Sequence, residues 1–298
     1  MEERTWIQRY IAPLVTAPGA DGLRDDVAIL SVTGPTIATM DTLVEGIHFL
    51  SRDPLHTVGQ KLIRVNVSDI LAKGAAPVEA LLSVAWPRER PETDFADLIR
   101  GIGKDLDDLS VHLIGGDLVK TDGPLTLTLT LTGMCINEGP VQRAGGRVGD
   151  KLWVNGEIGW GGLGLEAAKA GGDPEIASRY RIPRISGLAD AETVAEMASA
   201  SMDVSDGLLL DVAQLAAASE CGARIDLDRV PLAAPTDTLA DVFTQCTSGD
   251  DYRILLSAPP EQVVPGFSCI GQLTSAPGLS LTHGGQFVNA PSTLGFEH

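Results

Sequence analysis

Short acidic motifs recur along the chain, most of them where an apolar stretch is interrupted. The six motifs are Arg24-Asp25-Asp26, Met40-Asp41-Thr42, Val67-Ser68-Asp69, Gly115-Gly116-Asp117, Asp203-Val204-Ser205-Asp206-Gly207 and Ser248-Gly249-Asp250-Asp251. An ionised carboxylate beside an apolar core costs free energy unless a positive charge compensates it, and few Lys or Arg residues stand near these motifs. Oxygen ligands, with no Cys or His at metal spacing, favour magnesium over zinc. Since magnesium usually shares its ligand shell with phosphate oxygens, the motifs predict a magnesium–nucleotide site.

Each motif taken alone also has a purely structural interpretation, because Asp and Gly commonly form turns. On that alternative the chain is an acidic globular protein whose aspartates only cap helices and turns. The coincidence of six such motifs in one chain favours the metal site.

Composition limits the partners. The chain has 298 residues, enough for two domains or one large one, with 44% hydrophobic and 21% charged residues. Its formal net charge of −18 argues against a nucleic-acid partner and against an anionic membrane surface, which both need a basic face. Anionic substrates would therefore need divalent cations as mediators, in agreement with the acidic motifs.

The expected location is the cytoplasm. The four cysteines are widely spaced without a CxxC pair, which is typical of reduced, buried thiols. Met1-Glu2-Glu3-Arg4 lacks a basic segment followed by an apolar one, so we expect no signal peptide. No stretch is long and apolar enough to span a bilayer.

The N-terminal half alternates helical and strand patterns. Residues 125–132 alternate Leu and Thr, which predicts a strand with all its leucines on one face. Its threonine face suits a partly covered sheet or a subunit contact. We favour the simpler interpretation, in which the strand is an ordinary part of the protein core. The other expected elements are helices over 6–15, 54–73 and 95–106 and strands over 36–40, 80–86 and 111–114, the first of these strands ending at Asp41.

A break at 137–140 and Gly145-Gly146 predicts a domain boundary near 138–148, with domains over 1–140 and 141–298. Beyond it we expect a strand over 151–154, helices over 162–170 and 187–200, and a helix that begins at Ser205 or Asp206. The stretch 223–298 is predicted to be rich in strands.

Other nucleotide and hydrolase motifs fit poorly. Residues 159–164 match GxGxxG after a strand, but no second strand ends in an acidic residue about 20 residues later, as a dinucleotide fold requires. Residues 145–151 have the wrong spacing for a P-loop. No GxSxG elbow occurs, so a hydrolase triad has no support.

The acidic motifs, taken in order, resemble those of the thiamine-monophosphate kinase family, within the superfamily of enzymes like aminoimidazole ribonucleotide synthetase. The resemblance covers nearly the whole chain. Its most specific segments are residues 41–49, 66–75, 114–117, 143–145, 203–208 and 248–252.

The resemblance implies an α/β fold of the α+β type with two α/β domains. The N-terminal domain would carry a mixed sheet that pairs across a homodimer, and the C-terminal domain would close over the nucleotide. It implies ATP and thiamine monophosphate as substrates and several Mg²⁺ ions on the ATP phosphates. The residues that it implies are Asp26, Asp41, Asp69, Asp117, Asp203 and Asp206 for the metal ions, Gly116, Asp117, Arg143 and Ser205 for the nucleotide, and His48, Asp250 and Phe296 for the acceptor.

Three positions depart from the family pattern. Arg24 replaces a glycine, Met40 replaces the hydroxyl residue before Asp41, and Asp250 replaces a common Glu. These departures leave two alternatives to a thiamine-monophosphate kinase open. One is another ATP-dependent enzyme of the superfamily with a different acceptor, and the other is a non-catalytic protein that binds magnesium and nucleotide.

Overall fold

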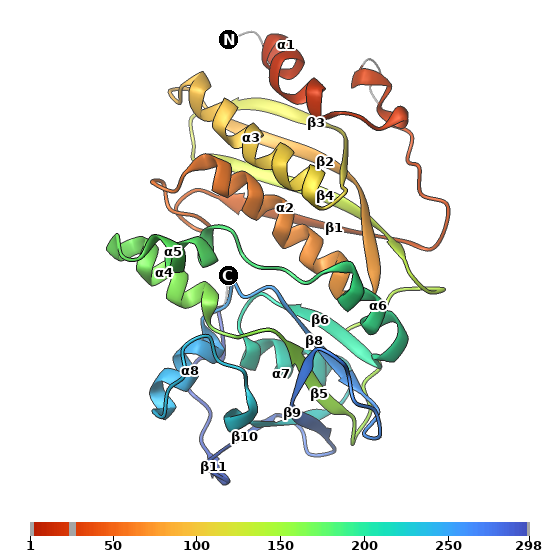
Figure 1. Cartoon of the computed structure of the whole chain (residues 1–298), viewed down its shortest axis with the longest axis vertical. Helices are drawn as coiled ribbons and strands as arrows, with labels where there is room; N and C mark the ends of the chain where they lie inside the picture. Colours follow the sequence, from red (N-terminus) through yellow and green to blue (C-terminus); the bar gives the residue numbers. More distant parts are fainter. Residues whose placement is uncertain (1–2, 24–27, 297–298) are drawn as a thin grey trace. The chain divides into compact units, whose positions relative to one another are not determined.

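The computed structural model describes residues 3–23 and 28–296. The chain divides into two compact units. Unit 1 comprises the residues up to Ile70 together with Ala76–Cys135, and unit 2 comprises Leu71–Ala75 and the residues from Ile136 onward. Figure 1 labels their helices and strands.

Unit 1 is built on a mixed sheet. Within its described residues the strand order is β1-β4-β2-β3, with β1 and β4 antiparallel and β2 and β3 parallel. Helices α2 and α3 cover one face of this sheet (Figure 1). The elements are α1 Glu3–Trp6, the helical turns η1 Ile7–Ile11, η2 Ala12–Leu14 and η3 Pro18–Leu23, β1 Thr36–Val44, α2 Leu55–Ala72, β2 Ala75–Pro87, α3 Glu92–Asp108, β3 His112–Thr121 and β4 Thr126–Cys135.

The Leu/Thr strand is β4, and its alternation works as predicted. All its leucines are fully buried, while its threonines are only partly buried on the opposite, open face of the sheet. Register places Met40 of β1 beside Thr130 on that open face, whereas Asp41 lies beside Leu129 on the helix-covered face. Because successive side chains of a strand point to opposite faces of the sheet, neighbouring residues such as Met40 and Asp41 must lie on different faces.

Two strands run further than the sequence indicates. β1 continues past Asp41 to Val44, and β3 continues through Gly115-Gly116-Asp117 to Thr121. The expectation that β1 ends at Asp41 is therefore wrong. Asp41 keeps its ladder position opposite Leu129, and its backbone N–H donates to the Asn66 side chain, so its carboxylate leaves the sheet without interrupting it.

Unit 2 contains a larger mixed sheet. Its described strands have the order β11-β10-β7-β9-β5-β8-β6, in which β10 and β7 are parallel. The elements are β5 Lys151–Asn155, α4 Trp160–Ala170, α5 Pro174–Arg181, α6 Leu188–Met197, β6 Ala200–Val204, α7 Leu208–Ala218, β7 Gly222–Asp226, η4 Leu227–Arg229, α8 Leu239–Thr247, β8 Arg253–Ala258, β9 Phe267–Thr274, β10 Leu279–His283 and β11 Gln286–Val288.

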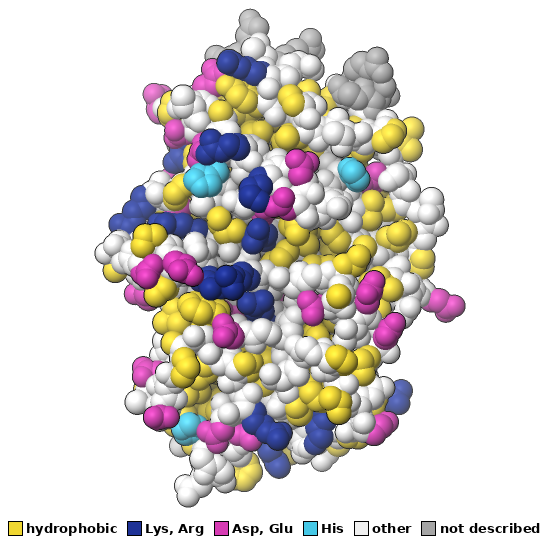
Figure 2. Space-filling view, in the orientation of Figure 1, with side chains coloured by type: hydrophobic (Ala, Val, Ile, Leu, Met, Phe, Trp, Pro, Cys, Tyr) yellow, Lys and Arg dark blue, Asp and Glu magenta, His cyan; other side chains and the backbone are white. Residues whose placement is uncertain are grey.

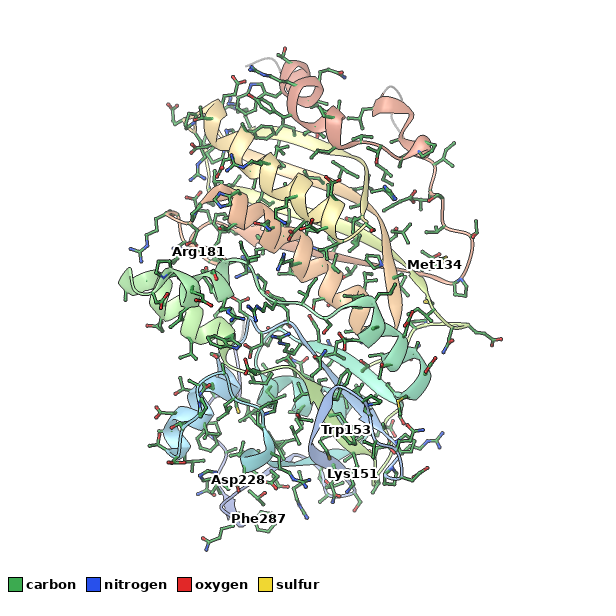
Figure 3. The ribbon with its side chains drawn as sticks, viewed as in Figure 1. Met134, Lys151, Trp153, Arg181, Asp228 and Phe287 are labelled. Carbon is green, nitrogen blue, oxygen red and sulfur yellow. The ribbon has the colours of Figure 1, made fainter. Side chains whose placement is uncertain are left out.

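The unit 2 sheet packs on α7, and their apolar side chains form one core cluster that includes Val154, Val204 and Leu215. Trp153 on β5 is buried, whereas Phe287 on β11 is exposed (Figure 3). The sequence missed α5 and α8. It also extended the helix at 187–200 too far, because α6 ends at Met197 and the buried strand β6 begins at Ala200.

Acidic side chains are spread over the face drawn in Figure 2 rather than gathered in a single patch. Among the described residues, no helix combines the length and the apolar character needed to cross a bilayer.

A buried ion pair joins α2 to α3, and we expect it to contribute to the stability of unit 1. The fully buried Asp105 accepts hydrogen bonds from Gln60 Nε2 at 2.8 Å and from Arg64 Nε at 2.6 Å. Asp105→Asn should lower the free energy of unfolding by about 3 kcal/mol, because it removes the negative charge of this buried pair beside the partly buried Arg64. Urea unfolding measures this, with the exposed Asp107→Asn as control. Equal stability of the two variants would contradict the prediction.

Candidate functional site

Asp41 and Asp69 form the acidic centre of unit 1. Asp41 comes from β1 and Asp69 from the last turns of α2, on the covered face of the sheet. Burial raises the pKa of Asp41 to about 6, and the charge of Asp69 raises it as well. Two carboxylates in such surroundings favour a shared cation over separate ionisation.

Two neighbours that the sequence analysis missed hold this pair in position. Thr39 Oγ1 donates to Asp69 Oδ2 at 2.5 Å, and Asn66 Oδ1 accepts from the Asp41 backbone N–H at 3.1 Å. Strand alternation places Thr39 on the same face as Asp41, and Asn66 lies three residues before Asp69 on one face of α2. These two spacings were visible in the sequence.

The donor chemistry of this pair fits magnesium. Within the described residues, no group of three or more His, Cys, Asp or Glu side chains lies close enough to hold a metal ion by itself. Magnesium does not need such a cage, because it is usually bound through one or two carboxylates together with water and substrate phosphates. Asp41 and Asp69 therefore supply what a magnesium–phosphate complex would require from the protein.

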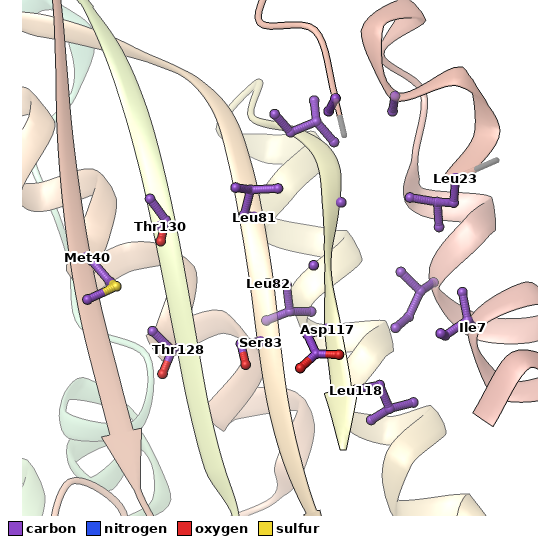
Figure 4. A pocket seen from close by; sticks show the side chains of 16 residues that line it. Ile7, Leu23, Met40, Leu81, Leu82, Ser83, Asp117, Leu118, Thr128 and Thr130 are labelled. Atoms are coloured by element: carbon purple, nitrogen blue, oxygen red, sulfur yellow. The ribbon is translucent and has the colours of Figure 1, made fainter. Parts of the chain in front are cut away.

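Asp117 lines a pocket of about 520 Å³ on the open face of the unit 1 sheet (Figure 4). Its walls come from β1, β4, β2 and β3 and from the N-terminal helical turns, including Ile7 and Leu23. Register pairs Asp117 with Ser83, and an extra residue in β3 shifts the ladder between Ala80 and Leu81. Bulges of this kind re-aim side chains next to functional sites.

The structure does not bring Asp117 to Asp41. β1 and β3 are the two outer strands of the sheet, so their backbones lie roughly 14 Å apart at the usual strand spacing. The two side chains also point to opposite faces, Asp117 beside Ser83 in the pocket and Asp41 toward α2. Within one protomer, Asp41 and Asp117 therefore cannot bind the same ion.

His48 lies in the turn that follows β1. Its Nδ1 accepts a hydrogen bond from the Val44 backbone N–H at 3.0 Å, and its carbonyl accepts from Lys61 Nζ at 3.1 Å. An Nδ1 that accepts carries no proton, so the neutral ring holds its proton on Nε2. The turn thus fixes the tautomer as well as the position of the ring.

In unit 2, main-chain hydrogen bonds bring four of the predicted residues together. The Asp250 backbone N–H donates to the Ser205 carbonyl at 2.8 Å, and the Phe296 N–H donates to the Asp206 carbonyl at 2.8 Å. The loop after β6, the loop before β8 and the C-terminal segment thus meet at one place. Phe296 remains about half exposed there, with 53% of its surface accessible.

The loop before β8 has an unusual backbone. Asp250 and Tyr252 both have positive φ, at 59° and 50°, and the Tyr252 hydroxyl donates to Asp250 Oδ1 at 2.8 Å. Strained positions of this kind persist only where the surroundings hold them, and they cluster at functional sites. The hydrogen bonds to Ser205 and from Tyr252 therefore define where the Asp250 carboxylate stands.

Buried Asp251 holds the neighbouring glycine loop. Its two carboxylate oxygens accept from the Gly159 N–H at 2.8 Å and the Gly161 N–H at 3.1 Å. Burial raises the pKa of Asp251 to about 7, although both hydrogen bonds and Arg253 oppose the shift. The GxGxxG segment thus has a structural partner inside the protein.

Three further predicted residues are Asp203, Arg143 and Asp26. Asp203 is a buried residue of β6, two positions before Ser205. Arg143 is exposed, and its carbonyl accepts from Ser219 Oγ at 3.3 Å. Asp26 lies outside the described residues, as does Arg24.

Comparison with known proteins defines the class. The N-terminal domain of AIR synthase related protein matches residues 24–135, and the C-terminal domain of the same class matches residues 147–267. The two α/β units agree with this class, so the prediction of two α/β domains, the first built on a mixed sheet, is confirmed.

Similar proteins narrow the class to a family. A thiamine-monophosphate kinase from Caulobacter vibrioides is 36% identical over 98% of this chain and 89% of its own length. The solved thiamine-monophosphate kinase of Stenotrophomonas maltophilia superposes with a TM-score of 0.82 at 26% identity, covering 94% of this chain and 96% of that one. AaThiL, solved in complex with AMPPCP and TMP, gives a TM-score of 0.77 at 27% identity over 87% of this chain and 86% of its own. The chain therefore belongs to the thiamine-monophosphate kinase family.

Gly116 yields a prediction about the pocket. A Cβ at this residue would lie 1.8 Å from the Leu82 carbonyl oxygen, so only glycine allows β3 to approach β2 here. Gly116→Ala should lower the free energy of unfolding by at least about 1–3 kcal/mol, because the backbone must shift to accept the methyl group. Urea unfolding is the measurement. Gly34→Ala is the control, since its Cβ would meet nothing closer than 3.9 Å, and equal stability of both variants would contradict the account.

Proposed function

We propose that this protein is a magnesium-dependent kinase that transfers the γ-phosphoryl group of ATP to thiamine monophosphate, giving thiamine diphosphate and ADP. The observation that carries the proposal is the pair Asp41 and Asp69, two neighbouring carboxylates whose burial and mutual repulsion raise the pKa of Asp41 to about 6. The names of the relatives and the AMPPCP and TMP of AaThiL support ATP and thiamine monophosphate as the substrates.

The carboxylates divide into groups with different tasks. Asp41 and Asp69 would hold magnesium on the covered face of the unit 1 sheet, and Asp117 would hold a further ion in the open-face pocket. Asp203, Asp206 and Asp26 complete the proposed ligand set. Bound magnesium would screen the charges of the phosphate groups and polarise the transferring one.

The remaining site residues would bind the organic parts and the phosphates. Gly116 presents its backbone to the pocket without a side chain, Ser205 offers a hydroxyl beside Asp206, and Arg143 offers a planar fork of donors that suits phosphate. His48 Nε2 and Asp250 would face thiamine monophosphate, with Phe296 covering its aromatic system. The half-exposed Phe296 ring is suited to stacking on a planar ligand.

The chemistry requires no side-chain base. The acceptor is a phosphate monoester that carries close to two negative charges at neutral pH, so its oxygen is already an anionic nucleophile. That oxygen forms a bond to the γ-phosphorus while the bond from the γ-phosphorus to the β,γ-bridging oxygen breaks, and ADP departs. The protein has to align the two groups in line and offset the repulsion between two anions.

The Met40 departure does not touch the acidic pair. Met40 points to the open face, where it lines the pocket of Asp117, and 64% of its surface is exposed. The side chain that supports Asp69 instead is Thr39, one residue earlier. Loss of the hydroxyl at Met40 therefore leaves the Asp41 and Asp69 pair supported.

The decisive experiment is product formation. Purified protein with ATP, Mg²⁺ and thiamine monophosphate should yield thiamine diphosphate, whereas free thiamine should give no product because it lacks the charged acceptor phosphate. Liquid chromatography separates the products. Magnesium-dependent ATP binding without product formation would favour the non-catalytic alternative, and product from another acceptor would favour a different enzyme of the superfamily.

The same assay tests the metal ligands. Asp117→Asn and Asp206→Asn should each lower turnover by about 100-fold or more while the protein stays folded, because an amide cannot replace an anionic magnesium ligand. Asp237→Asn, at an exposed aspartate, should keep wild-type turnover. Wild-type turnover in a folded Asp117→Asn or Asp206→Asn protein would refute the metal assignment.

We further propose a homodimer formed through the open face of the unit 1 sheet. This face carries the partly buried threonines of β4 and several exposed apolar side chains, among them Met40, Leu81 and Val119. Exposed apolar residues gathered on one sheet face are typical of a protein interface. A cytoplasmic location remains a prediction from the sequence.

Val119→Lys tests this interface. A lysine at the contact would be buried without a partner, so the monomer fraction should rise steeply, with an increase in the dimer dissociation constant of about 100-fold. Sedimentation velocity over a concentration series measures it, with Val263→Lys as the control at an exposed valine of unit 2. A monomeric wild type, or a Val119→Lys protein that remains dimeric, would contradict the proposed interface.

A further inference from the structure

Asp211 is a buried carboxylate that the acidic motifs do not include. It lies in α7, four residues after Gly207, and its side chain has no exposed surface. Its neighbours in the helix, Leu208, Leu209 and Val212, are equally buried members of the apolar core of unit 2. A carboxylate in such a place costs free energy unless it makes compensating hydrogen bonds.

One oxygen of Asp211 is bonded to the loop that carries Asp206. Oδ2 accepts from the backbone N–H groups of Asp206 and Gly207, both at 3.2 Å. The loop needs this support because Gly207 has a φ of +124°, and a Cβ there would lie 3.0 Å from the Thr247 carbonyl carbon. Asp211 therefore holds the loop from inside the protein.

The backbone of Asp206 is fixed on both sides as a result. Its N–H is held by Asp211 Oδ2, and its carbonyl accepts from the Phe296 N–H at 2.8 Å. With both peptide groups held, the direction of the Asp206 side chain is restricted to its own rotamers.

The second oxygen of Asp211 has no such task. Among the described residues, no donor reaches the buried Oδ1. Burial raises the pKa of Asp211 to about 7, and the Asp206 charge adds to the rise, while the two N–H groups and Arg143 oppose it. The hydrogen bonds to the Asp206 and Gly207 N–H groups are thus the interactions that the buried Asp211 carboxylate makes.

Asp190 shows what a purely structural carboxylate looks like in the same unit. It accepts from the Gly187 N–H at 2.9 Å at the start of α6, and its side chain is partly exposed. A helix start can therefore be capped without a buried carboxylate. The deep burial of Asp211 calls for a reason beyond capping of α7.

We infer that Asp211 is a positioning residue, which orients the Asp206 carboxylate for magnesium by holding the backbone N–H groups of Asp206 and Gly207. This inference rests on the proposed function, in which Asp206 binds magnesium. Removal of a group that orients a metal ligand commonly lowers the metal affinity by about 10–100-fold. The two hydrogen bonds involve only protein atoms, so they can be tested separately from metal binding.

The first measurement is hydrogen exchange of the protein without metal or nucleotide. Asp211→Ala should accelerate exchange of the Asp206 and Gly207 amides, because it removes their acceptor. Asp211→Asn should protect them nearly as well as the wild type, because its amide oxygen can replace Oδ2 and its amide nitrogen takes the place of the unbonded Oδ1. Asp190→Ala, the matched control, should accelerate only the amides at the start of α6.

The second measurement is calorimetric titration with AMPPCP over a series of Mg²⁺ concentrations. Asp211→Ala should need about 10–100-fold more Mg²⁺ for half-maximal nucleotide affinity. Asp211→Asn and Asp190→Ala should remain close to the wild type.

The outcomes distinguish a failure of the proposed function from a failure of the role inferred for Asp211. A wild type whose AMPPCP binding does not depend on Mg²⁺ would refute the proposed function, and with it the role of Asp211. A Mg²⁺-dependent wild type together with an unchanged Mg²⁺ requirement in Asp211→Ala would overturn only the inference. If Asp211→Ala fails to fold, a folded Asp211→Asn protein that protects the two amides but loses Mg²⁺-dependent binding would overturn it equally.

Discussion

Negative charge held in apolar surroundings is the constraint on which this structure depends. Burial raises the pKa of Asp41 to about 6 and of Asp211 and Asp251 to about 7. In unit 2, backbone donors compensate the buried carboxylates. Asp211 and Asp251 each accept two hydrogen bonds from main-chain N–H groups of a glycine-containing loop. In unit 1, the charge of Asp69 adds to the effect of burial on the pKa of Asp41. In the proposed function, a bound cation would offset the free energy lost on placing Asp41 and Asp69 in these surroundings.

The two units apply the same principle with different elements. In unit 1 a sheet and a helix present the acids directly, with Thr39 and Asn66 as lateral supports. In unit 2, Asp206 and Asp250 stand on loops, and the buried Asp211 behind the Asp206 loop fixes its backbone. A loop position can be precise only if its peptide groups have partners, because the conformational freedom of an unheld loop would spread the ligand positions. The positive φ values at Asp250 and Tyr252 persist for the same reason.

The sequence predicted the elements whose pattern is local. The Leu/Thr alternation of β4 and the periods of α2 and α3 are confirmed. Strand ends are less predictable: the sequence pattern predicts that β1 ends at Asp41, whereas this side chain lies on the helix-covered face and leaves the ladder intact. The separation of Asp41 from Asp117 depends on strand order, which no local pattern encodes. Asp211 stands among leucines in a helical period, where only the packed structure reveals which donors it meets.

In the proposed function, phosphoryl transfer goes directly from ATP to the phosphate of the acceptor, with carboxylates serving as metal ligands and not as nucleophiles. Its most direct test is a single turnover with ATP labelled at the γ-phosphorus, in the presence of Mg²⁺ and thiamine monophosphate, followed by rapid quenching. We expect the label to move from ATP into thiamine diphosphate at the rate of ATP consumption, with none becoming attached to the protein. Label on the protein before the product appears, or its release only as inorganic phosphate, would contradict the claim.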